Sequence, residues 1–148
     1  MSDDDDDAKA EARRRAAVSA RWDEYRREWL KEHPSLPASE FVRHAGVASP
    51  DAAGVVQGWE EVGRVSAILQ GGQRLYPLFQ LGPNGQPRPE RRPLLLAMRG
   101  RLESWRLAAW LTGNNAEFND WATPLEVIGR DPGAVVAAAK RAMAEVSF

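Results

Sequence analysis

Few side chains in this sequence could perform covalent or metal chemistry. The chain contains no cysteine and two histidines, His33 and His44. Protein zinc sites need three or four closely spaced Cys, His or acidic ligands, and neither histidine has such a spacing to a pair of carboxylates. Without cysteine there are also no disulfides and no thiol nucleophiles, which fits a reducing cytoplasm. The sequence therefore predicts no metal-binding residues.

The motifs that build common catalytic sites are missing as well. The sequence has neither a G-x-x-x-x-G-K-[ST] phosphate loop nor a G-x-S-x-G nucleophile elbow. Gly71-Gly72 is better explained by a turn than by phosphate binding, and the carboxylates are scattered along polar faces. We therefore predict that the protein is not an enzyme and has no catalytic or cofactor-binding residues.

Composition limits the remaining classes of function. A length of 148 residues allows one ordinary domain or two very small ones, and a formal net charge of −1 means that any nucleic-acid binding must come from a local basic face. No apolar run is long enough to cross a membrane, and the acidic N-terminus is unlike a secretory signal. We expect a cytoplasmic protein without a membrane partner.

A β-hairpin is predicted near the middle of the chain. Residues 65–69 and 74–81 are two β-prone runs, and Gly71-Gly72 lies between them. Paired glycines supply the positive φ values that a tight hairpin turn needs. The hairpin would join a first half of short helices to a second half rich in Trp and Leu.

The N-terminal region is predicted to be one long helix after a short acidic tail. Residues 2–7 are mostly aspartate, and we expect this run to be disordered at its start. Residues 8–32 contain no Gly or Pro and are rich in Ala, Arg and Glu. Four large side chains share one stripe of this helix, which either packs on the core of the chain or makes a dimer contact. The stripe consists of Val18, Trp22, Tyr25 and Trp29, and the last three are the predicted dimer contacts.

A helix-turn-helix is predicted between this helix and the hairpin. The first helix would span residues 38–45, and the second would begin with Ser49 as N-cap and Pro50 at the first helical position, ending near residue 62. The hairpin at residues 65–81 would then be a wing. Candidate DNA contacts are the polar and basic residues of the second helix and its edges: Arg43, His44, Ser49, Gln57, Arg64 and Arg74.

The chemistry of the second helix leaves its role open. It contains Asp51, Glu60 and Glu61 but no Lys or Arg, whereas base readout usually relies on Arg, Lys, Asn or Gln. Either the motif binds DNA with help from the basic residues at its edges, or it is a structural motif that no longer reads bases.

The second half is predicted to be helical. A long helix is expected over residues 93–112, and Phe118 and Trp121 would cover its apolar face. Thr123-Pro124-Leu125-Glu126 is a capping box that starts a short helix, and Asp131-Pro132 starts the last helix. The predicted fold class is thus mainly α, with a short hairpin.

Several motifs, in the same order, resemble those of Xre/MbcA/ParS-type antitoxins. The run Gly72-Gln73-Arg74-Leu75-Tyr76-Pro77-Leu78-Phe79-Gln80-Leu81 is similar to their "R-x-Y-P-x-F-Q-F" signature. Similar counterparts follow in residues 105–111, in Asn114-Asn115, in the capping box and in residues 135–139. The likeness covers about residues 36–146. Asn115 stands where the family often has proline, residues 118–122 depart from its usual loop, and the N-terminal helix lies outside the pattern.

The resemblance implies a toxin–antitoxin pair. The partner would be a RES-domain toxin that consumes NAD or transfers ADP-ribose, and the C-terminal helical domain would cover its active site. The antitoxin would dimerise, and the complex would bind operator DNA and regulate transcription of its own operon. The residues that would contact the toxin are Asn114, Asn115, Trp121, Glu126, Arg130, Lys140 and Arg141.

Two functions from different classes therefore stand after the sequence. One is an antitoxin, an interaction protein that inhibits an enzyme. The other is a stand-alone helix-turn-helix transcription regulator without a toxin. The sequence predicts three regions for either function: an acidic tail with a long helix at residues 1–34, a helix-turn-helix with its hairpin at 35–87, and a helical partner-binding domain at 88–148.

Overall fold

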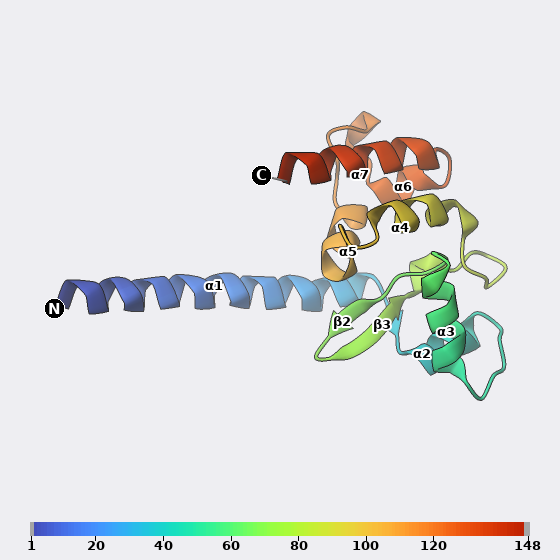
Figure 1. Ribbon diagram of the computed structural model, residues 1–148, viewed down its shortest axis with the longest axis horizontal. Helices are drawn as coiled ribbons and strands as arrows, with labels where there is room; N and C mark the ends of the chain where they lie inside the picture. The colour runs from blue at the N-terminus through green and yellow to red at the C-terminus, as the bar shows by residue number, and fades with distance from the viewer. Residues whose placement is uncertain (1, 147–148) are drawn as a thin grey trace. The chain divides into compact units, whose positions relative to one another are not determined.

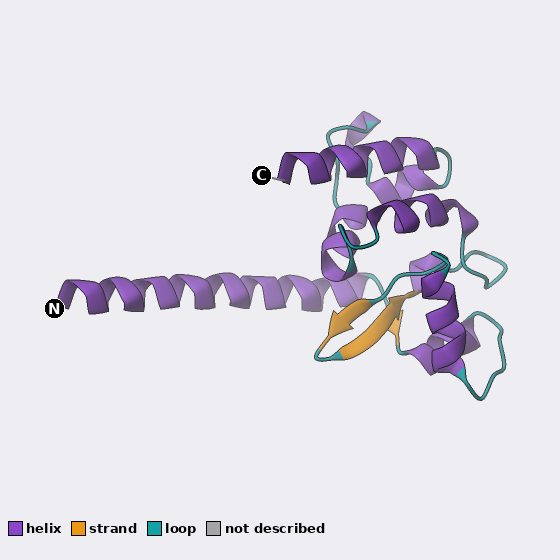
Figure 2. Cartoon of the chain, in the orientation of Figure 1, coloured by secondary structure: helices purple, strands orange, loops and turns teal. Residues whose placement is uncertain are grey.

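The computed structural model describes residues 2–146 and confirms a mainly α fold with a small antiparallel sheet (Figures 1 and 2). The chain divides into two compact units, Met1–Pro34 and Ser35–Phe148. Each unit is described by itself below. The further division predicted at residues 87 and 88 stays a prediction.

The first unit is built on one helix, α1 (Ser2–Glu32). The acidic run at residues 2–7 was expected to be disordered at its start, but it is helical from Ser2 and is the first part of α1. Asp3, Asp4 and Asp5 lie in the first turn, where carboxylates interact favourably with the positive end of the helix dipole. Local electrostatics therefore explain why this acidic segment is helical.

The predicted aromatic stripe of α1 divides into an exposed and a buried part. Trp22 and Tyr25 are 37% and 38% exposed, whereas Trp29 is 3% exposed. The rings of Trp22 and Tyr25 stack with their centroids 5.2 Å apart, and the Arg26 guanidinium lies over Trp22 at 5.0 Å. Trp29 packs its ring against His33, at 4.6 Å between centroids. An exposed association surface on α1 would therefore use Val18, Trp22 and Tyr25.

The second unit begins with the two helices of the helix-turn-helix, α2 (Ala38–His44) and α3 (Ala52–Glu61). The predicted start of the second helix at Ser49-Pro50 was wrong by two residues. Asp51 is the N-cap, and its side chain accepts a hydrogen bond of 3.1 Å from the Gly54 N–H. The Ser49 hydroxyl instead accepts the Asp51 N–H at 3.1 Å, in the turn before the helix.

Three short antiparallel strands form the wing: β1 (Ser35–Leu36), β2 (Ile68–Gln70) and β3 (Gln73–Pro77), in the order β1-β3-β2. The predicted hairpin is present between β2 and β3, with Gly71 and Gly72 at φ values of 58° and 78°. Strand β1 was not predicted, because two residues carry no periodic signal. The predicted second run ends early, since Leu78–Gln80 is a 3₁₀ turn.

The long helix expected over residues 93–112 is two helices. A 3₁₀ turn at Pro89–Arg91 leads into α4 (Arg92–Met98), and α5 (Ser104–Thr112) follows after a break. Gly100 has φ of 77° in this break, a conformation that ends a helix and that glycine adopts without strain. The helical spacing of apolar residues continues across the break, and it therefore predicted a single helix. Gly100 instead lies between two helices.

Both predicted caps in the C-terminal part are confirmed. Helix α6 (Pro124–Ile128) begins after Thr123, whose Oγ1 accepts the Glu126 N–H at 3.1 Å. Helix α7 (Pro132–Val146) begins after Asp131, whose Oδ1 accepts the Ala134 N–H at 3.1 Å. Phe118 packs against the core as expected. Trp121 does not, because it is 63% exposed at the end of a 3₁₀ turn, Asn119–Trp121.

Two hydrophobic clusters support the second unit. One joins the helix-turn-helix to the wing, through Phe41, Val42, Val56, Val65 and Tyr76. The other lies among the C-terminal helices, where α4 and α6 both contact α7 (Figure 1). Its buried members include Leu94, Met98, Leu111, Ile128, Val135 and Ala139. None of the helices in the described part of the chain has the length and apolar character needed to cross a bilayer.

Candidate functional site

The exposed face of α3 offers few groups that could read a base. Gln57 is exposed, and Glu61 is the other exposed residue with a long polar side chain on this helix. Ser49 is half-buried and its hydroxyl is already engaged in the turn before α3. Of the two readers expected from the sequence, Gln57 is thus the one in position to contact bases.

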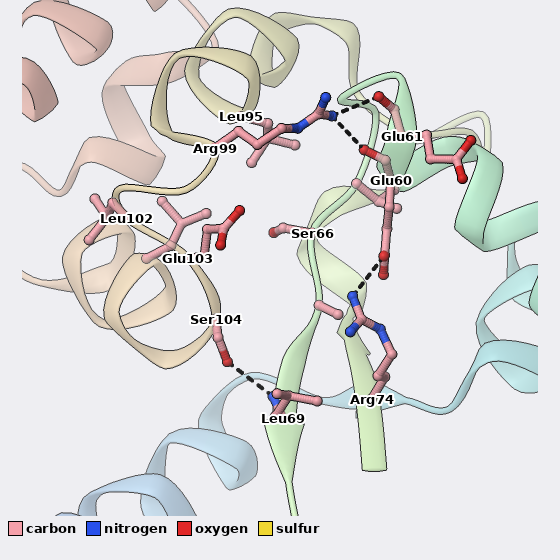
Figure 3. A pocket seen from close by; sticks show the side chains of 13 residues that line it. Glu60, Glu61, Ser66, Leu69, Arg74, Leu95, Arg99, Leu102, Glu103 and Ser104 are labelled. Carbon is pink, nitrogen blue, oxygen red and sulfur yellow. Dashed lines mark hydrogen bonds and ion pairs between the residues drawn. The ribbon is translucent and has the colours of Figure 1, made fainter. Parts of the chain in front are cut away.

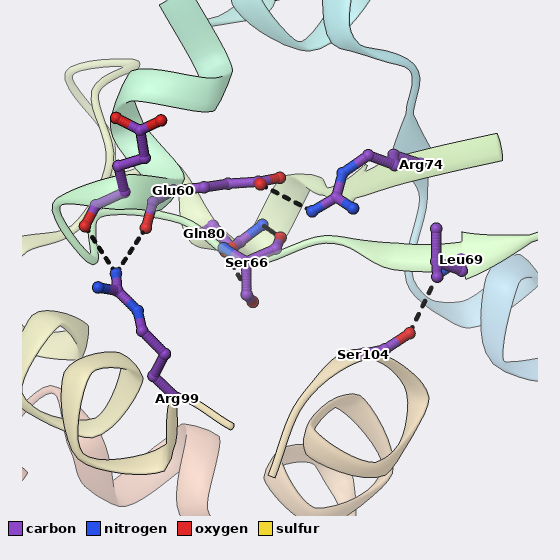
Figure 4. A network of polar contacts seen from close by, with 8 residues as sticks. Glu60, Ser66, Leu69, Arg74, Gln80, Arg99 and Ser104 are labelled. Carbon is purple, nitrogen blue, oxygen red and sulfur yellow. Dashed lines mark hydrogen bonds and ion pairs between the residues drawn. The ribbon is translucent and has the colours of Figure 1, made fainter. Parts of the chain in front are cut away.

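Arg74 lies across from α3 on strand β3 and is neutralised there. Its guanidinium forms an ion pair with the Glu60 carboxylate at 2.7 Å (Figure 4). Burial raises the pKa of the neighbouring Tyr76 hydroxyl to about 12, and the Glu60 carboxylate adds to that increase. Gln57, Glu60 and Arg74 line one hollow of about 450 Å³. The structure therefore places Gln57 and Arg74 in one hollow. The Glu60 carboxylate, also on α3, already pairs with the arginine.

The other predicted DNA contacts lie at the two ends of the helix-turn-helix. Arg43 and His44 are exposed in the last turn of α2. Arg64 follows α3, and its guanidinium lies 5.4 Å from the centre of the Trp59 ring. These three side chains could contact phosphates rather than bases, since none lies on α3 itself.

Two arginines that the sequence did not single out hold the end of α3. The Arg99 guanidinium donates to the carbonyls of Glu60 and Glu61, at 2.9 and 2.7 Å (Figure 4). Nε of Arg92 donates to the Val62 carbonyl at 2.9 Å. The last carbonyls of a helix lack partners within it, and cations are favourable at this end of the dipole. Both arginines come from α4 and the loop after it, so α3 is anchored by the C-terminal helices.

A second set of contacts joins the wing to the C-terminal helices. The Leu69 N–H donates to the Ser104 hydroxyl at 3.1 Å, and Nε1 of Trp105 donates to the Leu69 carbonyl at 2.8 Å. Leu69 lies on β2, an edge strand whose outer backbone groups need partners. Ser104 has φ of 54°, a left-handed conformation at the start of α5. The start of α5 thus completes the hydrogen bonding of the wing.

A hollow of about 520 Å³ lies between these two sets of contacts (Figure 3). Glu60, Glu61 and Glu103 are among its lining residues, together with Arg74 and Arg99. Arg74 is paired with Glu60, and Arg99 binds backbone carbonyls. Two serines also line it: the Ser66 hydroxyl donates to Oε1 of Gln80 at 3.2 Å, and the Ser104 hydroxyl accepts from the Leu69 N–H. Within residues 2–146 no cluster of three potential metal ligands occurs.

The loop between α5 and α6 presents an exposed tryptophan on a braced backbone. Nδ2 of Asn114 donates to the Trp121 carbonyl at 2.6 Å, and the Asn115 N–H donates to the Ala122 carbonyl at 3.1 Å. Asp120 and Trp121 have φ values of 61° and 53°. A tryptophan in this region of φ is rare, and such backbone strain gathers at functional sites.

The remaining predicted toxin contacts are also on the surface. Arg141 on α7 forms a two-pronged ion pair with Glu117 in the loop, at 2.9 and 3.0 Å, and hydrogen bonding to Arg141 lowers the pKa of the Glu117 carboxyl. Glu126, Arg130 and Lys140 are exposed on α6, the turn after it and α7. The structure thus places Asn114, Asn115 and Trp121 in one loop, which Arg141 ties to α7.

Comparison with known proteins identifies a similar fold but no family. No family model matches the sequence, and none of the curated proteins compared with it matches either. The NMR structure of Rv2175c is similar, with a TM-score of 0.51 and 17% sequence identity, over 76% of this chain and 77% of that chain. At this identity the similarity shows a shared fold and nothing more about function.

Proposed function

We propose that the chain is an antitoxin: an interaction protein that binds a toxin with its C-terminal helices and contacts DNA with its winged helix-turn-helix. The motifs between residues 72 and 139 that resemble Xre/MbcA/ParS-type antitoxins support this proposal. They also indicate the partner, a RES-domain toxin whose active site the C-terminal helices would cover. Self-association into a homodimer is part of the same proposal.

The observation that carries the proposal is the exposure of Trp121 on a braced loop. An exposed tryptophan costs solubility, and tryptophan is among the residues that contribute most to protein–protein binding. Here two backbone-directed hydrogen bonds hold its loop, and Phe118 anchors the loop to the core. A contact residue that is already ordered loses little conformational entropy when a partner binds. The surface is therefore suited to tight binding of a folded partner.

A helical layer behind the loop makes the surface rigid. Helices α4, α5, α6 and α7 share one apolar cluster, and two of their starts are capped by side chains. Rigid elements hold binding side chains more accurately than flexible ones do. This arrangement supports inhibition by surface coverage rather than by a catalytic step.

The test is co-expression with the product of the neighbouring gene. We expect a stable complex and rescue of growth from a toxic neighbour. Trp121→Ala should weaken the complex by about 2 kcal/mol, a roughly thirtyfold loss of affinity, because it removes an exposed aromatic contact. Leu69→Ala is the matched control, since Leu69 is 49% exposed but lies on the wing. Equal neutralisation by both variants would contradict the placement of the toxin surface.

The alternative is a stand-alone transcription regulator, and the intact geometry of α2, α3 and the wing favours it. The two functions differ in a simple respect. A regulator of this kind would bind upstream DNA by itself, with an affinity that falls as salt rises. Absence of a toxic neighbour, together with salt-sensitive DNA binding by the purified chain, would select the regulator.

A further inference from the structure

A second hollow, of about 530 Å³, has a distinctly cationic lining. It lies where the end of α3, the loop at residues 82–88 and the start of α4 come together. Three arginines and two side-chain amides are among its lining residues, which include no carboxylate: Arg64, Arg88, Arg92, Asn84 and Gln86. Guanidinium and amide groups together are donors that match the oxygens of a phosphate.

Each arginine is oriented by a neighbour that leaves most of its donors available. Arg64 lies against the face of Trp59, and Arg92 uses Nε on the Val62 carbonyl. Arg88 has the Glu90 carboxylate 3.9 Å from Nη1, a long ion pair, and its Nε is buried without a hydrogen-bond partner among the described residues. A phosphate oxygen in the hollow is an acceptor of the kind that such a donor needs.

A further arginine lies between Arg88 and Arg92 in the chain. Arg91 is a buried residue whose Nη1 donates to the Phe79 carbonyl at 2.8 Å. Burial, together with the charge of Arg88, lowers the pKa of Arg91 to about 10, and the Glu90 carboxylate acts in the opposite direction. The surroundings therefore hold more positive charge than their own carboxylates offset, a condition that a bound anion would relieve.

The hollow of 520 Å³ near the wing is the internal comparison. It too contains two arginines, but one is paired with Glu60 at 2.7 Å, and Glu61 and Glu103 also line it. Two hollows of similar size in the same unit thus have opposite electrostatic character. The two hollows are therefore distinguished by charge and not by size, and the one with an excess of arginine is the candidate phosphate site.

The cationic hollow is attached to the helix-turn-helix. Nε2 of Gln86 donates to the Ala45 carbonyl at 2.7 Å, directly after α2, and the Gly82 N–H donates to the Gln86 carbonyl at 2.8 Å. The loop at residues 82–88 therefore connects the hollow to the helix end that carries Arg43 and His44. A sugar-phosphate strand that passes the end of α2 could reach Arg43 as well as the three arginines of the hollow.

We propose that Arg64, Arg88 and Arg92 form a phosphate-binding site that contacts the sugar-phosphate backbone of DNA. The site positions the duplex and does not read its sequence, which agrees with the lack of cations on α3. This inference rests on the DNA-binding half of the proposed function and is independent of toxin binding.

The test measures binding of the full chain to a short duplex of mixed sequence over a range of salt concentrations. Arg88→Gln is the main variant, because the Arg88 side chain makes no hydrogen bond to the backbone of α3 or α4. We expect a loss of roughly tenfold in affinity at low salt and a decrease of about 1 in the slope of log K against log salt. Arg64→Gln added to it should lower the slope again.

Arg101→Gln is the control, with the same loss of charge at an exposed residue outside the hollow. Circular dichroism and thermal melting check that every variant is folded. Inorganic pyrophosphate, followed by calorimetry, is the second probe. If Arg88→Gln abolishes pyrophosphate binding but binds DNA like the control, the hollow binds a free phosphate compound and the proposed contact with DNA is wrong.

The inference is overturned if Arg88→Gln and Arg101→Gln bind both probes equally, or if the wild-type chain binds neither. Toxin neutralisation is measured on the same variants. If the chain neutralises its toxin but binds neither phosphate probe, the proposed phosphate site is wrong and the antitoxin proposal stands. If phosphate binding depends on Arg88 but no neighbouring gene encodes a toxin, the phosphate site stands and the antitoxin proposal is wrong.

Discussion

Glu60 is the residue on which the contacts around α3 converge. Its carboxylate pairs with Arg74 of the wing, and its carbonyl accepts from Arg99 beyond α4. The sequence suggested Arg74 as a DNA contact because an arginine beside a recognition helix has that role in many proteins. It could not show the ion pair, since Glu60 and Arg74 are 14 positions apart and meet only through the folding of the wing.

Arg99 should contribute measurably to stability. Replacing it with alanine removes two charge-assisted hydrogen bonds to helix carbonyls, both at exposed positions. We expect the free energy of unfolding to fall by about 1–2 kcal/mol, measured by urea denaturation. Arg101→Ala, at another exposed arginine two positions away, should change it by less than about 0.5 kcal/mol. Equal effects of the two substitutions would mean that hydrogen bonds from water stabilise the carbonyls of α3 as well as those from Arg99 do.

At the scale of elements, the break between α4 and α5 decides how the C-terminal helices fold back. Gly100 turns the chain at positive φ, and a Cβ there would meet no atom within 4 Å. An alanine side chain at residue 100 would therefore clash with no neighbour. The free-energy cost of the substitution would come from the positive φ of the backbone. Gly58 in α3 has equally open space but ordinary helical geometry, since positive φ is absent there.

These two glycines should respond in opposite directions. Gly100→Ala should destabilise the protein by about 1 kcal/mol, because a left-handed conformation is costly for any residue with a Cβ. Gly58→Ala should stabilise it by about 0.5–1 kcal/mol, because alanine is the better helix former. Thermal or urea unfolding of the two variants gives the comparison. If both changes stabilise the protein, the break between α4 and α5 is not held at this glycine.

Elements with local signals were predictable and those with long-range causes were not. The hairpin turn and the caps at Thr123 and Asp131 depend on neighbours within three residues, and all three are as expected. The start of α3 was misplaced because Ser49 and Asp51 are both good caps, and only the folded turn selects between them. Strand β1 and the anchoring arginines depend on partners 30 or more residues away, which no local pattern reveals.

The candidate site followed the same division. Exposure of the predicted contacts Asn114, Glu126 and Lys140 agrees with their polar character. Trp121 was expected to cover the core and was also named as a toxin contact. The first prediction is wrong, because the side chain is 63% exposed, and the second stays a prediction. Arg88 and Arg92 stand in a run rich in Arg and Pro, a signal in the sequence whose meaning appears only once the run lines a hollow.

At the scale of the molecule, α1 is a unit of its own. A helix of 31 residues extends for about 46 Å, and its exposed aromatic pair has little to bury against within the helix itself. Arg14–Glu11 and Lys31–Glu28 ion pairs add only slightly to its stability, because both are exposed. Association of two copies would bury the Trp22 and Tyr25 rings.

The proposed homodimer can be tested on these rings. Trp22→Ala combined with Tyr25→Ala should convert a dimer to a monomer in light scattering. Alanine favours the helix more than either aromatic residue does, so a loss of mass could not result from unfolding of α1. Arg21→Ala with Glu24→Ala is the matched control, at exposed positions off the stripe, and should leave the mass unchanged. An unchanged mass in the aromatic variant would exclude this surface as the dimer contact.

The anchoring of α3 has a consequence for how such a protein can diversify. Arg92 and Arg99 bind the carbonyls of residues 60–62, and every amino acid supplies a carbonyl. Exposed positions such as Ala53 and Gln57 can therefore be exchanged without loosening the attachment of the helix. Variants with a different exposed face on α3 could therefore arise while the attachment of α3 to the C-terminal helices stays the same.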